Sequence, residues 1–82
     1  MLAAGACQRL GAAHKASGSL DEAVAFYSQC LDIRSALAGH QSLLVAEINH
    51  ELGVVHFARG DFTKAEELFR ESVEVKVNLL GE

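Results

Sequence analysis

The stretches CQRLGAAH at residues 7–14 and NHELGVVH at residues 49–56 decide the fold of this chain. Both contain the pattern Leu-Gly-x-x-His, and Leu10 lies 42 positions before Leu52. A fixed period of roughly 20–50 residues is typical of stacked-repeat proteins, whose units bury a continuous core only by stacking. The sequence therefore predicts two copies of one structural unit.

Each unit is expected to be a pair of helices. Apolar residues recur at spacings of three and four, which places them on one face of a helix. This spacing predicts helices over about residues 2–16, 20–38, 43–59 and 62–80. Short turns between consecutive helices make neighbours antiparallel, so we expect two hairpins that stack on one another.

The turns and helix starts carry their own signals. Gly18 and Gly60 are expected to end the first helix of each pair, because glycine readily takes the left-handed conformation that follows a helix. Ser19 and Glu22 predict a capping box at the start of the second helix. Asp61 is the expected N-cap of the fourth helix. The segment 39–42 is the expected connection between the hairpins.

The helix faces expected to be buried combine small, aliphatic and aromatic residues. They are Ala3, Ala6, Cys7, Leu10, Ala13 and His14 in the first helix, Leu20, Ala23, Val24, Tyr27, Cys30, Leu31 and Leu37 in the second, and Phe62, Ala65, Leu68, Phe69, Val73 and Leu79 in the fourth.

Composition excludes several functions. Half of the 82 residues are apolar, the net charge is −4, and lysine and arginine form no cluster. An acidic chain without a basic patch argues against nucleic acid or an anionic membrane surface as a partner. No apolar run is long enough to span a bilayer, and the N-terminal stretch lacks the layout of a signal peptide. Cys7 and Cys30 are expected to be buried free thiols in a reducing, cytoplasmic compartment, with a disulfide or redox role as the alternative.

The sequence offers no convincing catalytic or metal centre. His50-Glu51 begins like a H-E-x-x-H zinc motif, but the next histidine is His56. Because the two histidines are six residues apart, their imidazoles lie on different faces of the helix and cannot share a zinc ion. His14 and His56 are expected to be packed or half-buried side chains. We find no glycine-rich phosphate loop and no nucleophile elbow, so we expect no enzyme activity, cofactor or metal.

The repeat resembles the tetratricopeptide repeat, in which the first helix carries W-x2-L-G-x2-Y and the second carries A-x3-F. Here the second-helix motifs are Ala23-x3-Tyr27 and Ala65-x3-Phe69. The 42-residue period is similar to the extended repeats of kinesin light chains. HEAT repeats share the period but lack this motif. The resemblance implies an all-α, right-handed superhelix of two hairpins, with small residues where the two helices of a unit cross and aromatics beside the crossing.

Domain boundaries follow from the same register. We expect a single domain over residues 1–82, with repeats at about 1–39 and 43–81. Gly81-Glu82 corresponds to Gly39-His40, so we expect the domain to be part of a longer array.

The resemblance also implies a binding surface. In this family the first helix of each unit lines the concave face, and by register the following residues should lie there: Gln8, Ala12, Lys15, Glu47, His50, Val54 and Phe57. An exposed aromatic such as Phe57 would suit an extended or helical peptide, although it could instead pack against a neighbouring helix. The lysine and asparagine residues that clamp a peptide carboxylate in some relatives are missing here, so we do not expect a carboxylate clamp.

The leading hypothesis is a non-catalytic interaction module that binds a peptide segment of another protein. A second is a stacking or spacer unit that self-associates through its C-terminal helix, because Leu79 and Leu80 have no obvious cover. A third is the regulatory part of an enzyme whose catalytic domain lies outside this chain.

Overall fold

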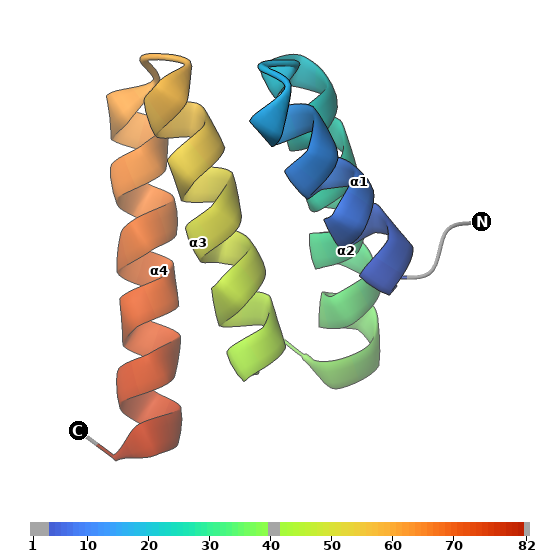
Figure 1. The fold of residues 1–82 in the computed structure, drawn as a ribbon. Helices are drawn as coiled ribbons and strands as arrows, with labels where there is room; N and C mark the ends of the chain where they lie inside the picture. The colour runs from blue at the N-terminus through green and yellow to red at the C-terminus, as the bar shows by residue number, and fades with distance from the viewer. Residues whose placement is uncertain (1–3, 40–41, 82) are drawn as a thin grey trace.

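The computed structural model describes residues 4–39 and 42–81. It contains four α-helices, α1 (Ala4–Ala16), α2 (Leu20–Ala38), α3 (Leu43–Ala58) and α4 (Phe62–Leu80), and the described residues form no strand. The expected all-α fold of two antiparallel hairpins is confirmed (Figure 1). His40, Gln41 and Ala3 lie outside the described residues, so the middle of the expected inter-hairpin connection and one expected core residue are not described.

The helices pack in chain order, α1 against α2, α2 against α3 and α3 against α4 (Figure 1). The Cα atoms extend 36 × 30 × 15 Å, which is a thin slab rather than a closed four-helix bundle. α2 and α3 each pack between two helices, and among the described residues α3 has the most buried positions.

The two tight turns are copies of one another. Gly18 and Gly60 have φ angles of 84° and 85°, the left-handed values expected from the sequence. The amides of Ser19 and Asp61 donate to the carbonyls of His14 and His56 at the same distance, 2.8 Å. The 42-residue repeat is therefore a repeat of backbone hydrogen bonds as well as of residue types.

The predicted capping box at Ser19 is wrong, and Asp61 occupies the N-cap position without forming the expected bond. Neither side chain accepts a hydrogen bond from the first turn of its helix. The tight turn holds both residues near φ −90° and ψ 70°, away from the extended conformation of a capping residue. Ser42 has that conformation, with φ −141° and ψ 139°, and its hydroxyl accepts a hydrogen bond from the Leu44 amide at 3.2 Å.

The core runs through the middle of the slab. Its largest fully buried side chains come from α1, α2, α3 and α4, and they are Tyr27, Ile48, Val45, Val55, Cys7, Cys30 and Ser72. Both cysteines are thiols with no exposed surface and are not joined in a disulfide, as expected. Burial raises the pKa of the Cys30 thiol, against the opposing effect of Arg34.

Six residues expected in the core are exposed, for two reasons. Leu10, Ala13, Phe62 and Val73 lie on the outward faces of α1 and α4, where no further helix covers them within the described residues. Leu37 and Leu79 lie in the last turns of α2 and α4, which at 19 residues each are longer than α1 and α3. Their ends therefore extend past the partner helix in each hairpin.

Candidate functional site

In each hairpin, a glycine of the first helix packs closely against an aromatic ring of the second helix. A Cβ atom added to Gly11 would lie 3.0 Å from two carbons of the Tyr27 ring, and one added to Gly53 would lie 2.7 Å from the Phe69 ring. Such distances are shorter than ordinary van der Waals contact. The expectation that these glycines mark a close helix crossing is confirmed, and the aromatics lie directly on them.

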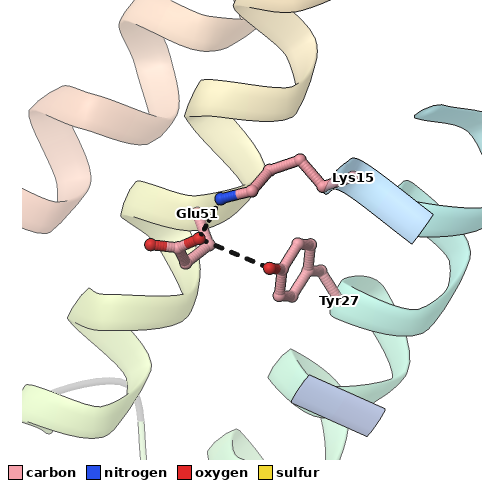
Figure 2. Close-up of polar contacts among 3 residues, drawn as sticks. All are labelled: Lys15, Tyr27 and Glu51. Carbon is pink, nitrogen blue, oxygen red and sulfur yellow. Dashed lines mark hydrogen bonds and ion pairs between the residues drawn. The ribbon is translucent and has the colours of Figure 1, made fainter. Parts of the chain in front are cut away.

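The hairpins are joined to each other by a polar cluster of Lys15, Tyr27 and Glu51, which come from α1, α2 and α3 (Figure 2). Glu51 Oε2 accepts hydrogen bonds from Lys15 Nζ at 2.8 Å and from Tyr27 Oη at 3.3 Å. Burial, and then the nearby Glu51 carboxylate, raise the pKa of the Tyr27 phenol to about 12. A second ion pair, Arg59 to Asp21 at 3.2 Å, also links α3 to α2.

The seven residues expected on the binding face divide into two groups. On α1, Gln8 accepts a hydrogen bond from Arg34 at 2.8 Å and Lys15 is paired with Glu51, so both of these side chains have partners within the chain. Ala12 is exposed.

The four residues expected on α3 form a stripe, because positions 47, 50, 54 and 57 follow a helical spacing of three and four. Glu47, His50 and Phe57 are exposed and Val54 is half-buried. The His50 ring lies 5.3 Å from that of Phe69. The stripe is thus accessible along the central helix of the slab.

Phe57 is exposed over 59% of its surface and meets Phe62 edge to face, with ring centroids 5.1 Å apart. It lines an apolar pocket of about 360 Å³ together with Phe62, Ala65, Glu66 and Phe69. This pocket opens beside the turn between α3 and α4. Helical periodicity did not predict this pocket, although the three phenylalanines that line it are a signal in the sequence for an apolar site near this turn.

His14 and His56 are packed within their hairpins, as expected. His14 stacks on Phe26 with an interplanar angle of 7°, and His56 is buried with Nδ1 3.4 Å from Asp61 Oδ2. Among residues 4–39 and 42–81, no three histidine, cysteine or acidic side chains lie close enough together to hold a metal ion.

Two stacked helix hairpins, each with a glycine–aromatic contact between its own helices, define a helical-repeat protein. The tetratricopeptide repeat family matches residues 2–76, and the chain belongs to this family. Comparisons with curated proteins and with solved structures gave no match. Tetratricopeptide repeat domains generally mediate protein–protein interactions and are generally non-catalytic. In the described part of the chain, no helix is long and apolar enough to cross a membrane.

Proposed function

We propose that this chain is a non-catalytic adaptor that binds a peptide segment of a partner protein along α3. The observation that carries the proposal is the accessible stripe of Glu47, His50, Val54 and Phe57 on the central helix. The residues beside the stripe on α3 are buried against α2 and α4, so the stripe lies on a packed helix. A pre-formed surface lowers the entropic cost of binding.

The chemistry of the stripe favours a peptide with apolar and basic residues. Glu47 contributes a carboxylate, His50 a ring that donates and accepts hydrogen bonds, and Val54 and Phe57 an apolar contact. Ala12 would border the stripe on α1. Gln8 and Lys15 would act indirectly, through Arg34 and Glu51.

The 42-residue period supports the finer proposal that the repeats are of the extended, kinesin-light-chain-like kind. Two buried thiols that form no disulfide are in keeping with a cytoplasmic location.

Selection of a peptide library on the purified chain, followed by calorimetry of the selected peptides, tests whether the stripe binds peptide. His50→Ala and Glu47→Ala should each weaken binding by about three- to tenfold, as expected for the loss of one contact of about 1 kcal/mol. Glu67→Ala, an exposed substitution on α4, is the matched control and should leave the affinity unchanged. Equal affinity of the selected peptides for the wild-type chain, His50→Ala and Glu47→Ala would show that the stripe is not the binding site.

A second candidate function is that of a stacking unit in a larger assembly. It is favoured by the exposed apolar residues of α4, which include Phe62 and Val73 at 60% and 59% exposure, as well as Leu80.

A further inference from the structure

The contact between the two hairpins provides an internal template for stacking. In that contact α2, together with Lys15, presents one face, and α3 presents the other. By the 42-residue register, the equivalent of the first face lies on α4 together with Phe57, and the equivalent of the second face lies on α1. Both of these equivalent faces are outermost in the slab (Figure 1).

Exposure shows which residues the template contact covers. Leu52 on α3 is 4% exposed, whereas its counterpart Leu10 on α1 is 37% exposed. On the opposite face Tyr27 is 1% exposed, and its counterpart Phe69 is only half-buried. The outer faces of α1 and α4 are therefore two halves of a contact of the same kind.

The polar residues at the centre of the contact between the hairpins are replaced on both outer faces, and the replacements suit one another. Lys15 and Tyr27, which hold Glu51, are replaced at the outer end by Phe57 and Phe69, and Glu51 itself is replaced on α1 by Arg9. A carboxylate placed over this aromatic pocket would lose its partners, whereas a guanidinium is attracted to ring faces. The α4 pocket is thus suited to α1 and unsuited to α3.

Differences in side-chain size also favour the pairing of the α4 face with the α1 face. The α4 side gains bulk, because Phe62 stands where the first repeat has Leu20. The α1 side loses bulk, because Ala6 and Ala13 stand where α3 has Ile48 and Val55. A large residue opposite small ones keeps the packing volume close to constant, which is the condition for a well-filled interface.

Charge also agrees. Glu66 lines the pocket at the position of Val24. Its carboxylate pairs with Arg70 at 2.6 Å and lies on the side that Arg9 would approach, where it could be shared between the two guanidinium groups. The template ion pair of Asp21 with Arg59 has neutral counterparts, Thr63 and Ser17, so no like charges meet.

We infer that a second copy of this chain docks head to tail, with the α1 face of Arg9, Leu10 and Ala13 on the α4 pocket of Phe57, Phe62 and Phe69. The two surfaces are different, so the contact is heterologous and can propagate into an open filament. The inference rests on the second candidate function. It shares Phe57 with the stripe on α3, but the substitutions that test it, at Ala13 and Phe62, lie outside the stripe.

Sedimentation of the full chain over a range of concentrations tests the docking. The weight-average mass should rise from the 8.8 kDa of one chain to at least twice that value. Ala13→Glu blocks the α1 face and Phe62→Glu blocks the α4 face, and both positions are exposed, so each variant should fold. Circular dichroism confirms folding, and Glu67→Gln is the matched control that should still associate.

Mixing distinguishes the head-to-tail arrangement from others. Each blocked variant should be monomeric alone, and an equimolar mixture should form a species of twice the monomer mass and none larger, because only one intact α1 face and one intact α4 face remain. Self-association of Ala13→Glu alone would show a contact that does not use the α1 face and would overturn the inference. A wild-type chain that stays monomeric at every concentration would overturn it too, and would assign the pocket to another protein. Neither result would affect the peptide-binding test.

Discussion

The ring of Tyr27 lies against the backbone of Gly11 so closely that a Cβ atom at residue 11 would be 3.0 Å from two ring carbons. Tyr27 has little freedom to move away, since it is 1% exposed and its hydroxyl is bonded to Glu51. This contact sets the separation of α1 and α2, and with it the shape of the first hairpin.

Gly11→Ala should therefore lower the free energy of unfolding by about 1–3 kcal/mol, the usual cost of overpacking a core. Gly5→Ala is the matched control in the same helix, because its nearest neighbour is the flexible end of Arg9 at 3.8 Å. It should be neutral or stabilising by up to about 1 kcal/mol, from helix propensity alone. Chemical denaturation measures both, and equal effects of the two substitutions would contradict the contact.

Alkaline pH should destabilise the fold through Tyr27. Its pKa is about 12 in the folded chain and about 10 when unfolded, so the native state binds the proton more tightly. The stabilisation is fully present below pH 10 and is lost as the pH rises towards 12. At most it amounts to about 2–3 kcal/mol, at 1.36 kcal/mol per pKa unit.

The titration can be followed directly, because Tyr27 is the one tyrosine of the chain and there is no tryptophan. Ultraviolet absorbance of the phenolate should show a midpoint well above 10 in the folded chain. Tyr27→Phe should remove the difference in unfolding free energy between pH 9 and pH 11 that is assigned to this group. A phenolate midpoint at the value of free tyrosine would contradict the buried, carboxylate-facing environment.

The ion pair of Lys15 with Glu51 should stabilise the contact between the hairpins by about 0.5–1 kcal/mol. A double-mutant cycle with Lys15→Met and Glu51→Gln isolates the coupling. The pair of Arg70 with Glu66 serves as the comparison, since its side chains are 63% and 70% exposed against 31% for both members of the Lys15 pair. The coupling should be smaller for the exposed pair and should fall further with added salt. A larger coupling in the exposed pair would be the opposite of this expectation.

Ser72 should contribute to the second hairpin through its hydroxyl, which donates to the Ala46 carbonyl at 2.9 Å in a buried position. Ser72→Ala should cost about 0.5–1.5 kcal/mol, the net value of one hydrogen bond. Ser72→Cys, which reproduces the residue of the first repeat at Cys30, should recover part of the loss because it restores the volume. Thermal unfolding of the three chains gives the order, and an unchanged stability of Ser72→Ala would argue against the bond.

The sequence predicted the elements of the fold well because their causes are local. Each of these causes lies within one repeat. They are the helical spacing of apolar residues, the glycines at positions 18 and 60 that end a helix, and the packing of small residues against aromatic rings. Capping failed at Ser19, because the geometry of the tight turn outweighs the preference of serine for the N-cap.

Burial was the part that the sequence could not predict, because it depends on neighbouring helices. Leu10 and Leu52 have the same motif around them, yet one lies on an outer face and the other in the core. The partner of Lys15 is 36 positions away on another helix, a relationship that neither periodicity nor composition contains. The binding stripe on α3 remains a prediction from register, with its accessible side chains as support.

The positions of the cysteines have a practical consequence. Cys7 and Cys30 are both in the first hairpin, fully buried and not joined in a disulfide, while the corresponding places in the second hairpin hold Asn49 and Ser72. A thiol-modifying reagent can reach them only when the core around the first hairpin opens, so the labelling rate reports openings that expose this part of the core. Compared with hydrogen exchange over the whole chain, it would tell whether the two repeats separate one at a time or together, without any engineered probe.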